Sequence, residues 1–230
     1  PEPGEEVVTE VAERPTRQAK NGPPKKVAAA KQVEVMAPNY QQAVIPVVGL
    51  TPLLCHNMTQ EAKLSIVLDR QQKEEGATKG KKKKAAKSID EQFADSCYII
   101  DPDAEEHDGK YGFPTSGFRL ACVQAARTTD MPMTQARLAF LPLVEMVPIK
   151  FSEVRIRIDK VGGTTPGKPS TACVRAEFHN WSLDLPVEFD ADNTSLEVII
   201  NLLQRAGRCI GVGAWRPACG GLHGRFMVGE

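Results

Sequence analysis

A glycine-rich segment, residues 207–228, lies between a helical pattern and the last strand pattern of this 230-residue chain. Six glycines fall within the eighteen residues from Gly207 to Gly224. Glycine permits positive φ and the close approach of a ligand backbone. The segment follows a helix and precedes a strand, whereas a dinucleotide-binding loop follows a strand and precedes a helix. These features favour contact with a polymer backbone over a nucleotide cradle. A tight hairpin-like connection is the alternative.

The side chains of this segment are those that stack on bases or hold phosphates. They include Trp215, His223 and the arginines Arg216 and Arg225. Trp215 fits either a core anchor or a stacking platform. The two arginines flank the glycine cluster and are the strongest binding candidates in the chain.

Composition changes along the chain and predicts two parts. Residues 1–40 hold few large apolar side chains and many Pro, Glu, Lys and Ala, so we expect a flexible or extended arm. Residues 41–230 carry the apolar patterns of one folded domain. A lysine-rich insertion at about 74–88 interrupts it, and the formal net charge of zero hides this local excess of cations. A lysine run fits either a solvated loop or an electrostatic contact with phosphates or an acidic partner.

Periodicity predicts alternating strands and helices, and therefore an α+β sandwich with helices on one face of an antiparallel sheet. Strands are expected over 43–54, 96–100, 139–150, 154–159, 172–178, 181–189 and 225–228, with 172–178 and 181–189 as a strand pair. Helices are expected over 59–73, 88–93, 118–127 and 196–206. Thr115 or Ser116 is placed to cap the third helix, and Gly207 to end the fourth at the C′ position.

Two further pairs of arginines have a regular spacing. Arg119 and Arg127 lie eight residues apart and share a helix face. Arg155 and Arg157 alternate with apolar residues in the strand 154–159, which predicts that the arginine face is wet and open to a ligand. Ordinary solvated surface is the alternative for both pairs.

Three short motifs resemble those of the RAMP superfamily, the ferredoxin-like proteins that form the backbone of CRISPR effector complexes. They are Gly49-Leu-Thr-Pro-Leu53, Phe113-Pro-Thr-Ser-Gly-Phe-Arg119 and the capped helix followed by the glycine-rich segment. Residues 43–230 are more specifically similar to a protein group encoded by tailed bacteriophages and prophages. That group shares a Gly-x-Thr-Pro-Leu start and the ending Gly211-Val-Gly-Ala-Trp-Arg-Pro217.

The resemblance implies a modified ferredoxin-like or RRM-like core with a C-terminal glycine-rich loop. It also implies subunits that multimerise along single-stranded RNA or DNA. No catalytic pattern stands out in the sequence, so we expect a non-catalytic subunit without cofactor. No strand carries the aromatic consensus of a true RRM, so we expect contact with the nucleic-acid backbone rather than sequence readout. The candidate binding residues are Lys81, Lys82, Lys83, Lys84, Arg119, Arg127, Arg155, Arg157, Gly211, Gly213, Trp215, Arg216, Gly220, Gly221, His223 and Arg225.

The arm or the lysine-rich insertion could reach a neighbouring copy, and other phage or effector subunits are further expected partners. The chain has no apolar run near 18 residues, so no membrane partner is expected, and scattered cysteines suggest the reducing host cytoplasm. An alternative function is a virion structural protein, either capsid-associated or involved in assembly.

Catalytic and metal-binding patterns are weak. The four histidines lack metalloprotease spacing and the six cysteines include no C-x-x-C pair, so no metal site is expected. The acidic residues between Asp101 and Asp108 surround His107 and could bind a divalent ion through their oxygens. A metal-dependent nuclease is therefore a third hypothesis, against the simpler interpretation of a solvated acidic loop.

Overall fold

Strand β1 (Tyr40–Gly49) is hydrogen-bonded along both edges and organises the main sheet. The computed structural model describes residues 37–74, 87–162 and 170–229. In it, β1 pairs antiparallel with β9 (Ser182–Asp190) on one side and with β10 (Phe226–Val228) on the other. A short strand, β5 (Leu141–Pro142), adds to β9 and gives the order β10-β1-β9-β5.

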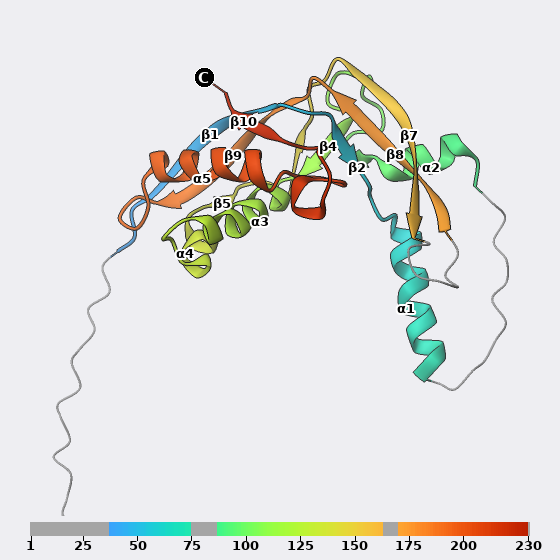
Figure 1. The fold of residues 1–230 in the computed structure, drawn as a ribbon, viewed down its shortest axis with the longest axis horizontal. Helices are drawn as coiled ribbons and strands as arrows, with labels where there is room; N and C mark the ends of the chain where they lie inside the picture. The colour runs from blue at the N-terminus through green and yellow to red at the C-terminus, as the bar shows by residue number, and fades with distance from the viewer. Residues whose placement is uncertain (1–36, 75–86, 163–169, 230) are drawn as a thin grey trace, which may run out of the picture. The chain divides into compact units, whose positions relative to one another are not determined.

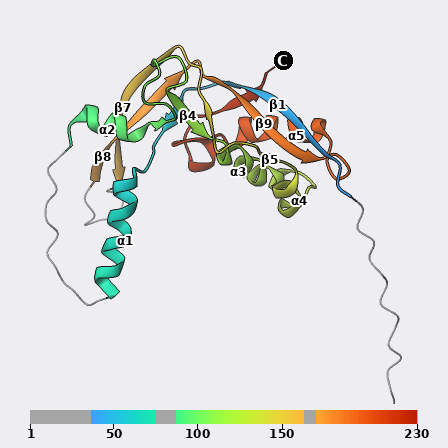
Figure 2. The ribbon, with the colours of Figure 1, turned by 180° about the vertical axis from the view of Figure 1, so that it is seen from behind.

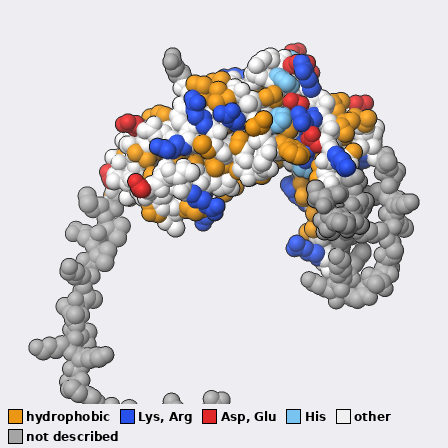
Figure 3. Space-filling view, viewed as in Figure 1, with side chains coloured by type: hydrophobic (Ala, Val, Ile, Leu, Met, Phe, Trp, Pro, Cys, Tyr) orange, Lys and Arg blue, Asp and Glu red, His pale blue; other side chains and the backbone are white. Residues whose placement is uncertain are grey.

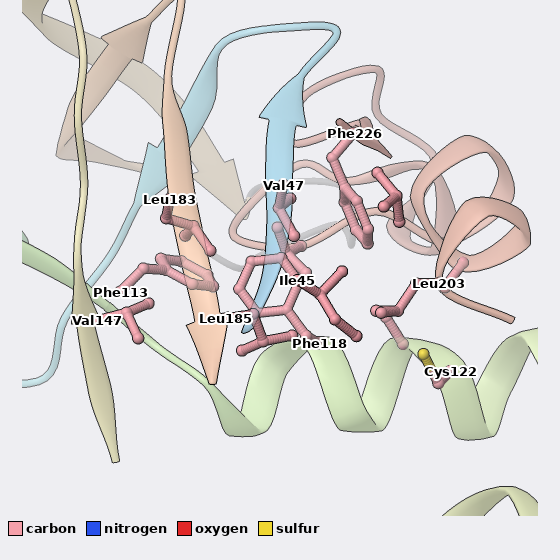
Figure 4. Packing of buried hydrophobic residues seen from close by; sticks show 14 of the residues in the cluster. Ile45, Val47, Phe113, Phe118, Cys122, Val147, Leu183, Leu185, Leu203 and Phe226 are labelled. Carbon is pink, nitrogen blue, oxygen red and sulfur yellow. The ribbon is translucent and has the colours of Figure 1, made fainter. Parts of the chain in front are cut away.

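Helices α3 (Ser116–Ala125) and α5 (Leu196–Cys209) cover one face of this sheet and pack against each other (Figures 1 and 2). The odd-numbered residues Ile45 and Val47 of β1 point to the helices and are buried, whereas Val44 on the other face is 64% exposed. Figure 4 shows this core, where Phe118 and Phe226 meet edge to face with ring centroids 5.2 Å apart. Burial of these apolar side chains is the main force that holds the layers together.

Two smaller sheets come from segments on either side of α3. The order of the first is β2-β8-β7 and that of the second is β3-β4-β6, and all neighbours are antiparallel. The strands are β2 (Leu53–Cys55), β3 (Tyr98–Ile99), β4 (Tyr111–Pro114), β6 (Met146–Pro148), β7 (Glu153–Gly162) and β8 (Ser170–His179). The remaining helices are α1 (Gln60–Glu74), α2 (Ile89–Ser96) and α4 (Met133–Leu138), with single 3₁₀ turns η1 (Ala126–Thr128) and η2 (Pro217–Cys219).

Local capping explains where two helices begin. Ser88 and Glu91 form a reciprocal capping box at α2, and the Ser195 hydroxyl accepts from the Val198 amide at α5. Thr115 holds the N-cap position of α3 as expected, but its hydroxyl donates to the carbonyl of Glu145 instead of capping the helix.

The predicted end of α5 is wrong by one turn. The helix continues through Gly207 to Cys209, and Gly211 (φ +69°) is the glycine at the C′ position, with its amide donating to the Ala206 carbonyl. Gly207 is buried inside the helix, where α5 lies so close to β10 that an added Cβ would be 2.1 Å from the carbonyl oxygen of Phe226. Because Gly207 has no side chain, α5 can lie in contact with β10. The residue does not end the helix.

The expected pairing of 172–178 with 181–189 is also wrong. β8 pairs with β2 and β7, whereas β9 pairs with β1 and β5. Asn180 adopts φ +48°, and Trp181 is buried, with Nε1 donating to the Thr51 carbonyl at 2.8 Å. Burial of this indole therefore takes the chain into a different sheet.

The α+β class is confirmed, with antiparallel sheets throughout the described residues. The predicted strands 43–54 and 139–150 each divide into two, while β4 and α4 were not predicted. No helix in the described ranges has both the length and the apolar character needed to span a bilayer. The predicted arm falls almost wholly among the residues outside those ranges, as does most of the lysine-rich insertion, and both stay predictions.

Gly207→Ala tests the contact between α5 and β10. Alanine normally stabilises a helix interior relative to glycine by about 1 kcal/mol. Here the methyl group would meet the Phe226 backbone, so we expect a loss of about 2 kcal/mol or more in the free energy of unfolding. Urea denaturation measures it. The control, Asn201→Ala at an exposed position of the same helix, should gain about 0.5 kcal/mol. A gain in both variants would contradict the packing described.

Candidate nucleic-acid interface

The glycine-rich segment is packed tightly against itself and against β2. A Cβ on Gly213 would lie 2.6 Å from the carbonyl oxygen of Leu54, and one on Gly224 would lie 1.8 Å from that of Val212. Gly221 is similarly close to the Trp215 carbonyl oxygen, at 1.8 Å. Contacts within the chain therefore account for these three glycines, whereas Gly220 (φ +79°) has nothing within 4 Å of its would-be Cβ.

The segment and the start of α3 line one groove. A cavity of about 400 Å³ lies between Pro114–Gly117 and Gly213–Arg216, and a second of about 170 Å³ continues along α3 toward Gly211. Arg216 lines both cavities, and its Nη1 donates to the Gly213 carbonyl at 3.1 Å. The N-terminus of α3 brings the positive end of its helix dipole to the same groove. Two motifs singled out in the sequence, about a hundred residues apart, thus form one surface.

Arginines dominate the helix-bearing side of the main sheet. α3, α4 and residues 210–225 contain no Asp or Glu, and α5 contains only Glu197. Figure 3 shows several Lys and Arg side chains spread over this face. No arginine of these elements or of the adjoining turn η1 has a carboxylate partner within the described part of the chain; they are Arg119, Arg127, Arg137, Arg205, Arg208, Arg216 and Arg225.

Four of these arginines were predicted to bind, and they divide into two groups. Arg216 and Arg225 lie in the glycine-rich segment and are partly exposed. Arg119 and Arg127 both reach the region of α4, since Arg119 donates twice to the Arg137 carbonyl and Arg127 Nε contacts Met133 Sδ at 3.5 Å. The second pair therefore has a structural role in fixing α4 to α3.

The strand with Arg155 and Arg157 forms, but its faces are not divided as predicted, because Arg155 is exposed, Arg157 is partly covered and the isoleucines are exposed. The apolar residues Ile156 and Ile158 are 46% and 56% exposed, whereas the Arg157 side chain is only 33% exposed. The glycine-rich segment covers the charged face, where His223 Nε2 lies 3.2 Å from Arg157 Nη1. Arg155 lies apart from the groove and forms a bidentate ion pair with Glu153 on the exposed part of β7.

Beneath the segment lies a charged network that the sequence analysis missed. Asp159 accepts from Arg157 at 2.9 Å and from Arg175 at 2.6 Å, and Arg175 is only 8% exposed. Burial acts to raise the pKa of Asp159, but the hydrogen bonds from the two arginines outweigh it and leave that pKa below its usual value. Its carboxylate is therefore charged and bridges the two guanidinium groups.

Two histidines border this network, and both have lowered pKa values. Burial is the main cause for His223 and His56, and the nearby charges of Arg157 and Arg175 respectively add to it. An arginine can only donate, so His223 Nε2 accepts and the proton of the neutral ring lies on Nδ1. His56 Nδ1 lies 3.6 Å from Cys173 Sγ on the same side of the sheet.

The remaining predicted features do not join the groove. Lys81, Lys82, Lys83 and Lys84 lie outside the described residues. The acidic loop around His107 is largely exposed, with the imidazole ring 4.7 Å from the Phe151 ring. Among the residues that the structure describes, no three His, Cys, Asp or Glu side chains form a group suited to a metal ion.

Models of known protein families give no match to the chain, and no curated protein is significantly similar to it.

Asp159→Asn tests the charged network. The change leaves Arg175 buried without its counter-charge, so we expect the free energy of unfolding to fall by about 3 kcal/mol, measured by urea denaturation. Glu153→Gln is the control, because it breaks an exposed pair on the same strand and should cause no measurable change. Equal effects of the two substitutions would contradict a buried network.

The lowered histidine pKa values predict a loss of stability in mild acid. The unfolded chain takes up these protons near pH 6.5, before the folded chain does, so stability is full above that pH and falls as the pH drops below it. Urea unfolding at pH 7.5 and 5.5 measures the difference. His223→Gln should show a smaller difference than the unaltered chain. An unchanged difference would show that His223 is not buried as a neutral ring.

Proposed function

We propose that this protein is a non-catalytic subunit that binds the backbone of single-stranded RNA or DNA and multimerises along the strand. The observation that carries the proposal is the arginine-rich, carboxylate-poor face formed by α3, α4, α5 and the glycine-rich segment. A phosphate chain carries one negative charge per nucleotide and is attracted to such a face without sequence preference.

The groove gives this attraction a location. Arg216 supplies a fixed cation at the point where the two cavities meet, and the α3 N-terminus adds the positive end of its dipole. Arg225 belongs to the same segment, and its amide is fixed by the Thr51 hydroxyl at 3.0 Å. The bond of the Arg216 guanidinium group to the Gly213 carbonyl favours binding, because less side-chain entropy remains to be lost.

The opposite face of the main sheet repels a phosphate chain. Its outward residues include Asp184, Glu188 and Asp190, and Asp184 is paired with Lys150 at 2.8 Å. An RRM binds RNA on the open face of its sheet, so the acidic residues favour the helix side here. We therefore place the strand on the groove side.

The strand order supports a ferredoxin-like core, which belongs to the same proposal. β1, α3, β5, β9, α5 and β10 follow one another as β-α-β-β-α-β, with the first and third strands adjacent at the sheet centre. The residues from β2 to β4 would then be an insertion after the first strand, and β6 to β8 a second one. This arrangement is the one implied by the resemblance to the RAMP superfamily.

Exposed apolar side chains support the multimeric part of the proposal. Leu64, Val67 and Leu68 of α1 are at least half exposed, and α1 makes few contacts with other elements. Apolar surface of this kind marks sites of protein contact. The same observation favours the second candidate, a structural or assembly protein of a phage particle that binds no nucleic acid. The A260/A280 ratio of the purified protein, before and after nuclease treatment, distinguishes the two.

Fluorescence anisotropy with a labelled single strand tests the proposal. If about four phosphates are neutralised, affinity should fall about 50-fold between 50 and 200 mM salt, since the slope is roughly −0.7 per phosphate. The double variant Arg216→Ala/Arg225→Ala should weaken binding and make that slope shallower by about 1.4.

The control is Arg155→Ala, which removes one positive charge from an exposed ion pair away from the groove. It should leave both affinity and slope close to those of the unaltered chain. Equal loss in the control and the double variant would contradict the location of the site. Absence of binding by the unaltered chain at 50 mM salt would contradict the function itself.

A further inference from the structure

A cavity of about 210 Å³, separate from the two that form the groove, is lined by Val161, Arg175, Trp215 and Cys219. Two of these residues, Arg175 and Trp215, have features that are uncommon in folded proteins. One offers a buried hydrogen-bond donor without a partner, and the other presents an exposed aromatic ring beside the same cavity.

The first unusual residue is Arg175. It is more than nine-tenths buried, and Nη1 is satisfied by Asp159 at 2.6 Å, but Nε has no hydrogen-bond partner among the described residues. A buried donor without a partner is rare in folded proteins and calls for an acceptor from elsewhere. Arg175 lines the cavity, so an acceptor bound there would lie next to this guanidinium group.

The second is Trp215, which adopts the left-handed conformation at φ +50° and leaves its side chain 42% exposed. The conformation is imposed by close packing, because the Trp215 carbonyl accepts from the His223 amide and leaves no room for a Cβ on Gly221. Strained backbone of this kind concentrates at binding sites. Here it presents an indole at the mouth of the cavity instead of in the core.

Size and charge identify the class of ligand. At about 210 Å³ the cavity is below the roughly 300–1,000 Å³ of common ligand pockets, so it takes a single ring system rather than a whole nucleotide. The charge of Arg175 is already balanced by Asp159, so a neutral group with a hydrogen-bond acceptor fits better than a phosphate. A flat ring with carbonyl or ring-nitrogen acceptors, stacked on an indole, meets both conditions.

We propose that this cavity holds one base of the bound strand, stacked on Trp215 and accepting a hydrogen bond from Arg175. The inference rests on the proposed function, since it assigns this cavity to a base of the same strand whose backbone the groove would hold. It adds one stacked base per subunit to a contact that is otherwise electrostatic.

The test compares a thymidine homopolymer of about 12 nucleotides with an abasic strand of the same length and charge. The homopolymer should bind roughly 5- to 150-fold more tightly, which is the range for one stacked base. Trp215→Ala should lower its affinity to that of the abasic strand and leave abasic binding unchanged. Trp215→Phe should retain most of the difference, and the buried Trp181 reports that each variant is folded.

The outcomes separate the two proposals. Equal binding of the two strands, or equal loss for both in Trp215→Ala, overturns the base site and leaves backbone binding intact. If neither strand binds at low salt, the proposed function fails, and quenching of tryptophan fluorescence by thymidine then tests the cavity alone. Quenching in the unaltered chain that is lost in Trp215→Phe supports a base site. If thymidine does not quench the unaltered chain, the base site is overturned.

Discussion

The close contact of peptide groups around the glycine-rich segment is the constraint on which the rest of the candidate site depends. Gly213 against Leu54, Gly221 against Trp215 and Gly224 against Val212 each leave no space for a side chain. These contacts fix a loop that would otherwise be mobile, and they hold Trp215 in a conformation that costs of order 1–3 kcal/mol. Arg216 of the segment thereby lines the groove with its guanidinium group already bonded to the Gly213 carbonyl.

Electrostatic asymmetry follows from the same architecture. Two helices and the packed segment occupy one side of the main sheet and carry almost no carboxylates, while the outward residues of β9 are acidic. Beneath the segment, Asp159 joins Arg157 and Arg175 in a pair of short ion contacts. These charges neutralise one another inside the protein and hold the strands and the segment in place. Attraction of a nucleic-acid strand therefore depends on the exposed arginines.

The sequence was informative where the pattern is local. Helix α5 was predicted because its apolar residues recur at helical spacing after Ser195, and the alternation in β7 predicted a strand correctly. The pattern could not tell which face of β7 is covered, because that depends on a segment some seventy residues later. Arg175 was missed for the same reason: nothing in the neighbouring sequence indicates that it pairs with Asp159 and lines a cavity with Trp215. Gly207 was assigned to a helix end because its contact with Phe226 is invisible in local sequence.

The central claim is that a single strand lies against the helix side, across α3 and the glycine-rich segment. Hydrogen exchange measured by mass spectrometry, with and without a saturating single strand at low salt, tests it most directly. The account predicts slower exchange in residues 113–120 and 210–225, and no change in β9. Protection of β9, or no protection in either region while the strand is bound, would contradict it.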